Sequence, residues 1–250
     1  MKKMFPTMYD TPDRTLSMAG LFFGIICFYT FPFLTLFFSG GTLDRNYRSW
    51  FECIYHGVNF LITLWLFRNY LKESFFHVQC DLRSFFLTVF ICIGIMLVYA
   101  VGLIHLLLPT DSELLFLAVN GTLPLVEMEI FNVSSNLVAL NPIGGLISIV
   151  IFSPITISCV YYASTFAPFC ANRPWLAYLM MAVILTVPRA LSSLTFWPWD
   201  QNFTLYLAQL PLHMIACWSY QKTNTVWGPI ATHTIANAIS GILLLVLLAI

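Results

Sequence analysis

Long apolar segments constrain this chain more than any other feature. Seven of them approach the 20 or so residues that an α-helix needs to cross a bilayer. Only 9% of the residues are charged and 59% are hydrophobic, whereas soluble domains carry about 25% charged residues. We therefore predict an all-α polytopic transmembrane helix bundle that forms a single membrane domain over residues 1–250. The segments are Leu16–Phe38, Trp50–Phe67, Phe85–Leu108, Ile143–Phe166, Pro174–Leu194, Phe203–Tyr220 and Val226–Ile250.

The segment Pro109–Pro142, between the third and fourth apolar segments, has a different character. It contains four carboxylates and neither lysine nor arginine. We interpret residues 109–142 as a non-cytoplasmic acidic loop with a short amphipathic helix at the membrane interface. The carboxylates are Asp111, Glu113, Glu127 and Glu129.

The distribution of lysine and arginine predicts the orientation, because these residues favour the cytoplasmic side of a membrane. With a cytoplasmic N-terminus, about seven spans place most of the basic residues inside and only Arg45 and Arg48 outside. If residues 109–142 crossed the membrane, Arg173 and Lys222 would change sides, so seven spans fit better and eight remain an alternative. We expect an integral protein of the plasma membrane.

Charge and cysteine spacing exclude other classes of protein. The net charge is zero and there is no basic tract, so the sequence gives no reason to expect nucleic-acid binding. The seven cysteines lie mostly within apolar segments and form no Cys-x-x-Cys pair. Neither a disulfide framework nor a zinc site is indicated by this spacing.

His233 and Asn237 are the most informative polar residues. They are four residues apart in the last apolar segment, so a helix places them on one face. Polar side chains at membrane depth are costly and indicate either a functional site or a hydrogen bond between helices.

The residues before this pair extend the pattern over positions 220–237 and resemble the CPBP family of intramembrane proteases, which includes CAAX proteases and bacteriocin-processing enzymes. The family's third motif is His-x-x-x-Asn on the final helix, preceded by a helix that ends in tyrosine, a short basic-Thr-Gly turn and Trp-x-Pro. The matching residues are Tyr220, Lys222, Thr223, Trp227, Pro229, His233 and Asn237.

This resemblance implies an intramembrane endopeptidase fold, with a core over about residues 143–250, that acts on membrane-associated or lipidated peptides. In the family, a Glu-Glu-x-x-x-Arg motif supplies a carboxylate that activates water, and a Phe-x-x-x-His motif supplies a second polar group. His233 and Asn237 would then orient the nucleophile and stabilise the oxyanion. A divalent metal is a possible cofactor of an active enzyme.

The first two motifs are degenerate, and two registers remain open. In one, the paired glutamates fall on Ile157 and Ser158, the arginine on Tyr162 and the second-motif histidine on Arg189. In the other, Glu127 supplies the carboxylate, with Met128 as the second glutamate and Asn132 as the arginine. Asp200 then replaces the second-motif histidine.

Two further polar residues are candidates for the site. Arg189 lies within the fifth apolar segment, where it would pair with Glu127, Glu129, Asp200 or an anionic ligand, or extend to the outer interface. His213 follows Pro211, and a carbonyl group freed by that proline is a plausible partner.

Two functions therefore compete. The first is an intramembrane endopeptidase whose first two catalytic motifs are degenerate. The second is a non-catalytic relative that binds or regulates another membrane protein. The missing carboxylate favours the second function on physical grounds, since hydrolysis needs a group that activates water.

Overall fold

The computed structural model describes residues 11–38, 45–107, 141–170, 173–184 and 199–249. Side chains are described within 11–27, 50–99, 141–170, 173–184 and 210–242, except those of Glu52 and Ser240. These parts of the chain form seven helices, which confirms the all-α prediction for the described residues.

One helix, Pro142–Cys170, lies at the centre of the fold and is called the central helix below. It is built from five consecutive pieces: α6 (Pro142–Ile147), η2 (Ser148–Phe152), α7 (Ser153–Ile157), η3 (Ser158–Phe166) and α8 (Ala167–Cys170), of which η2 and η3 are π-helical. The other helices are α1 (Arg14–Phe38), α2 (Arg45–Cys80), α3 (Leu82–Leu107), an unlabelled helix Pro174–Ile184, α10 (Trp199–Thr223) and α11 (Trp227–Ala249).

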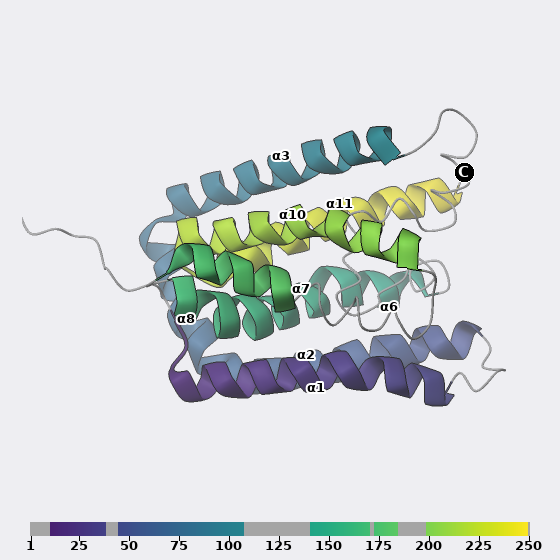
Figure 1. Ribbon diagram of the computed structural model, residues 1–250, viewed down its shortest axis with the longest axis horizontal. Helices are drawn as coiled ribbons and strands as arrows, with labels where there is room; N and C mark the ends of the chain where they lie inside the picture. The colour runs from purple at the N-terminus through teal and green to yellow at the C-terminus, as the bar shows by residue number, and fades with distance from the viewer. Residues whose placement is uncertain (1–10, 39–44, 108–140, 171–172, 185–198, 250) are drawn as a thin grey trace, which may run out of the picture.

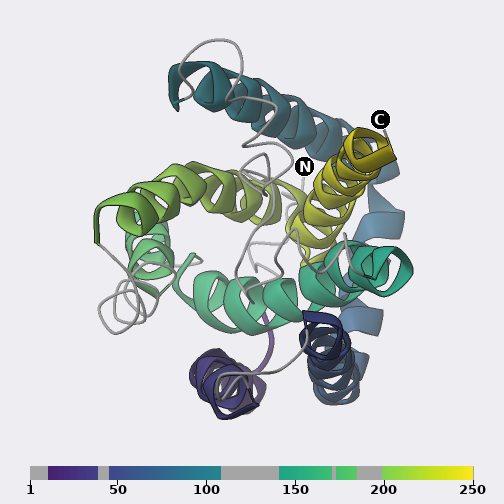
Figure 2. The same cartoon turned by 90° about the vertical axis from the view of Figure 1, so that its right-hand side faces the viewer.

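The helices lie side by side along the long axis of the molecule (Figure 1). Seen end-on, the central helix lies between α1 with the first part of α2 on one side and α10 with α11 on the other, and α3 covers the outer side of α10 and α11 (Figure 2). All nine residues of η3 are buried, so the core is organised around this stretch.

Every predicted apolar segment coincides with a helix as far as it is described. Two helical stretches in the described residues, Leu82–Tyr99 and Pro142–Cys170, are long and apolar enough to cross a membrane. Arg14–Cys27 and Pro174–Ile184 are shorter apolar helices. The number of spans therefore stays a prediction. The acidic loop lies outside the described residues up to position 140, after which Asn141 Oδ1 accepts the Gly144 N–H at 3.1 Å and caps the central helix.

Helix α2 extends further than its apolar segment. The second predicted apolar segment ends at Phe67, but α2 continues to Cys80. The extension has one buried face, formed by Tyr70, Leu71, Ser74 and Val78, which explains why it stays helical and packed. Asp81 alone separates α2 from α3, and its carboxylate Oδ1 accepts the Ser84 N–H at 3.1 Å.

Two glycines allow α1 to pack closely against η3. A Cβ atom at Gly20 would collide with the Ser164 hydroxyl and would lie 2.6 Å from Phe67 Cζ. A Cβ atom at Gly24 would collide with Val160. Small residues at this spacing let helices approach closely where packing drives their association.

Candidate functional site

His233 and Asn237 lie one turn apart on α11, and both side chains are buried. Asn237 Nδ2–H donates a hydrogen bond of 2.9 Å to the Ile149 carbonyl oxygen in η2. His233 Nε2 lies 3.4 Å from the Tyr162 hydroxyl oxygen in η3, with the two ring centroids 5.5 Å apart. The structure thus places the predicted pair inside the bundle, with both side chains directed at the central helix.

The Tyr162 hydroxyl also contacts His213 on α10. Its oxygen lies 3.0 Å from His213 Nδ1, and the centroids of the two imidazole rings are 6.4 Å apart. The predicted bond between His213 and a carbonyl group near Pro211 stays a prediction. A phenol hydroxyl donates a single hydrogen bond, so with neutral imidazoles one histidine nitrogen presents a lone pair and the other an N–H. These three residues are called the His–Tyr–His cluster below.

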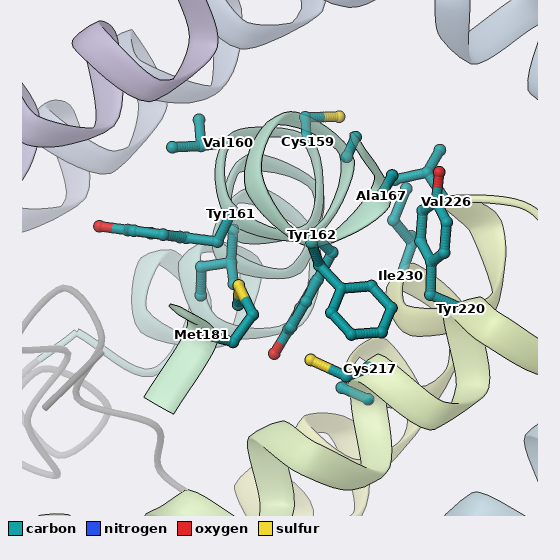
Figure 3. Packing of buried hydrophobic residues seen from close by; sticks show 14 of the residues in the cluster. Cys159, Val160, Tyr161, Tyr162, Ala167, Met181, Cys217, Tyr220, Val226 and Ile230 are labelled. Atoms are coloured by element: carbon teal, nitrogen blue, oxygen red, sulfur yellow. The ribbon is translucent and has the colours of Figure 1, made fainter. Parts of the chain in front are cut away.

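The π-helical geometry of η3 determines where Tyr162 lies. The Ala167 N–H bonds to the Tyr162 carbonyl oxygen, five residues earlier, and Ser164 Oγ donates to the Cys159 carbonyl oxygen at 2.9 Å. Such π-helical turns are rare and occur frequently at functional sites. Figure 3 shows Tyr162 pointing away from the central helix toward α10, beside Cys217.

Several buried side-chain atoms on α11 and on the central helix have no hydrogen-bond partner within the described part of the chain. On α11 these are His233 Nδ1 and Asn237 Oδ1. On the central helix they are the side-chain oxygens of Ser148, Thr156, Ser158 and Thr165. Leaving such an atom unsatisfied costs about 1–3 kcal/mol, so the interior is polar beyond what packing requires.

Among the described side chains, no carboxylate lies at the His–Tyr–His cluster. The three that are described, Asp13, Glu73 and Asp81, are all exposed. In the first register, the glutamate positions Ile157 and Ser158 are buried and precede Tyr162 on the same helix. Glu127 and Arg189 lie outside the described residues. Asp200 is the second residue of α10, and its side chain is not described.

The residues preceding His233 fasten the α10–α11 turn to the end of α2. The Thr225 and Ser74 hydroxyl oxygens are 2.7 Å apart, and the Trp227 indole Nε1–H donates to the Leu71 carbonyl oxygen at 3.0 Å. The Tyr220 and Tyr70 hydroxyl oxygens are 2.9 Å apart. Asn224 (φ 53°) takes the left-handed conformation that ends α10. Two residues of the resembling pattern, Tyr220 and Trp227, therefore have an architectural role here.

Thr225→Val is expected to destabilise this turn. The Thr225 hydroxyl donates to the Ser74 carbonyl oxygen at 3.0 Å and accepts the Trp227 N–H at 3.3 Å. Valine keeps the shape but leaves these buried groups unsatisfied, at a cost of about 1–3 kcal/mol. Thermal unfolding in detergent, followed by tryptophan fluorescence, measures the loss. Thr234→Val, at a half-buried position of α11, is the matched control, and equal losses in both variants would contradict the assignment.

In comparisons with known proteins, no family model, no curated protein and no solved structure matches the chain. The CPBP resemblance therefore stays a prediction from the residues of the third motif. Tyr162 was not predicted as the partner of both histidines. Its only signal was that Tyr162 fell on the arginine position of the first register.

Proposed function

We propose that this chain is an integral membrane protein related to the CPBP bundle, that it does not hydrolyse peptides, and that it binds another membrane protein or a membrane-associated peptide. Large exposed apolar side chains support the membrane setting, because they cover the outer faces of α1, α2 and α3. Examples are Phe22 (67% exposed), Trp65 (68%), Phe90 (66%) and Val98 (75%). Exposed apolar area of this extent on a soluble protein would be an aggregation liability.

The contacts of the Tyr162 hydroxyl with both histidines are the main support for the non-catalytic part of this proposal. Hydrolysis in the family needs a carboxylate that activates water and a histidine and an asparagine available to the reacting groups. Here, His233 Nε2 contacts a phenol and the Asn237 amide donates to a backbone carbonyl. Isoleucine and serine at positions 157 and 158 cannot replace a glutamate as a base in this mechanism.

The endopeptidase function retains one supporting observation. His233 Nδ1 is buried without a partner among the described residues, so it could accept a further group. This function would also need a carboxylate that activates water beside the pair, and Glu127 in residues 109–142 is the candidate.

Peptide cleavage distinguishes the two functions. The full chain is reconstituted into vesicles with farnesylated CAAX peptides, and release of the terminal tripeptide is followed by mass spectrometry. We expect no release above that of protein-free vesicles from either the wild type or His233→Ala, with intact peptide retained on the protein-containing vesicles. Release by the wild type that is lost in both His233→Ala and Glu127→Gln would establish the endopeptidase instead.

A further inference from the structure

Helix α2 is longer than a membrane is thick. Its 36 residues span about 54 Å at 1.5 Å per residue, whereas the hydrocarbon core of a bilayer is about 30 Å thick. If the chain is embedded as proposed above, on which this inference rests, α2 cannot lie along the bundle axis over its whole length, and Figure 1 shows its last part running across the end of the bundle toward the start of α3. This last part carries Arg68, Lys72 and Glu73, which are charged and exposed.

The last part of α2 is held in a fixed position. Its buried face contacts the α10–α11 turn through the hydrogen bonds of Leu71 and Ser74 described above, and Phe75 packs edge to face against Trp227 with ring centroids 5.4 Å apart. Arg68 and Lys72 lie four residues apart and are both exposed, so they lie on one outward face of an anchored helix.

Further cations lie at the same end of the molecule. Figure 1 shows that the end of α2, the start of α3 and the end of α10 meet there. Arg83 on α3 and Lys222 on α10 are exposed. Glu73 and Asp81 are the described carboxylates next to these cations in the sequence, and Asp81 already accepts the Ser84 N–H at the start of α3. We call Arg68, Lys72, Arg83 and Lys222 the basic end.

Exposed aromatic side chains lie among these cations. Trp65 (68% exposed) and Phe76 (64%) flank Arg68 and Lys72 at spacings of three and four residues, and Phe86 (53%) follows Arg83 on α3. Cations beside apolar rings suit the boundary between headgroups and acyl chains, where the rings enter the apolar layer and the charges meet phosphate. A soluble anion would use the cations and leave the aromatic rings in water.

We propose that the basic end binds the headgroups of anionic phospholipids. Each lysine or arginine at a membrane surface contributes about 1 kcal/mol of attraction to anionic lipid, or about fivefold in affinity. The structure places four such cations on three helices that meet at one end, so the preference arises from their joint positioning.

The test measures which lipid contacts the protein. The full chain is reconstituted into vesicles that contain either brominated phosphatidylserine or brominated phosphatidylcholine, and quenching of tryptophan fluorescence is compared. We expect at least fivefold stronger quenching by the serine lipid at equal mole fraction. The preference should fall several-fold in the double variant Arg68→Gln, Lys72→Gln, and it should be kept or increased in Glu73→Gln, the matched control at the neighbouring exposed position.

Three outcomes would overturn the inference: equal quenching by both lipids, an unchanged preference in the double variant, or loss of the preference in millimolar inorganic phosphate, which would indicate a site for soluble anions. Alkaline carbonate extraction of the same vesicles separates this inference from the proposed function. Wild type that remains in the membrane pellet but shows no lipid preference contradicts only the inference. Wild type that is extracted contradicts the membrane setting itself.

Discussion

Leucine at Gly20 or Gly24 is expected to prevent stable folding of this protein. The added side chain at Gly20 would occupy the space of Ser164 and Phe67, and at Gly24 that of Val160. These neighbours belong to α2 and to η3, both of which lie in the packed core. Overpacking by one methylene group already costs about 1–3 kcal/mol. A whole isobutyl group against a buried helix should cost more, because α1 must then separate from η3.

Gly94 is the control for this substitution. A Cβ atom there would have no neighbour within 4 Å, and the position is exposed on α3. We expect Gly94→Leu to give a monodisperse protein with a wild-type melting temperature, while Gly20→Leu and Gly24→Leu aggregate on detergent extraction. Size-exclusion chromatography with fluorescence detection makes the comparison. Similar elution profiles for all three variants would show that α1 does not pack as described.

Tyr162→Phe is expected to lower stability through the His–Tyr–His cluster. Phenylalanine retains the ring and removes only the hydroxyl that lies 3.0 Å from His213 Nδ1 and 3.4 Å from His233 Nε2. Hydrogen bonds between membrane helices contribute about 0.6–1.7 kcal/mol each. The loss should therefore be about 1–3 kcal/mol, and the melting temperature should fall by roughly 2–12 °C at about 2–4 °C per kcal/mol for a chain of this size.

Tyr178→Phe separates loss of this cluster from loss of any tyrosine hydroxyl. Tyr178 is half-buried and its hydroxyl donates to Gln221 Oε1 at 2.9 Å, so its removal exposes groups that water can reach. We expect a much smaller change in melting temperature. In a double-mutant cycle, Tyr162→Phe and His233→Ala should be non-additive, since each removes the same contact. Additive effects would mean that the phenol does not bond to His233.

The helices and the placement of His233 with Asn237 could be predicted because both depend on local pattern. An apolar run of membrane-spanning length forms a helix whatever its neighbours, and residues four apart share a helix face. The architectural role of Trp227 was not evident, because its partner Leu71 is 156 positions away in the sequence. A contact over that separation has no periodic signal.

The cluster around Tyr162 could not be predicted for a different reason. Motif registers were assigned from sequence spacing and the order of the apolar segments, but η2 and η3 are π-helical and depart from the 3.6 residues per turn of an α-helix, so spacing alone does not tell which side chains face α11. The extent of α2 was missed because charges at Arg68 and Lys72 end an apolar run without ending a helix. Its buried stripe of Tyr70, Leu71 and Ser74 becomes visible only with helical spacing.

The π-helical turns also limit how this gene product can change length during evolution. Each residue of an α-helix rotates its successors by about 100°. Loss of one residue between Ser158 and Tyr162 would keep the Ile149 carbonyl in contact with Asn237. It would also rotate the Tyr162 phenol away from both imidazoles. Substitutions between these two anchor points should be tolerated far more readily than indels, so in any descendants the number of intervening positions should persist longer than their identities.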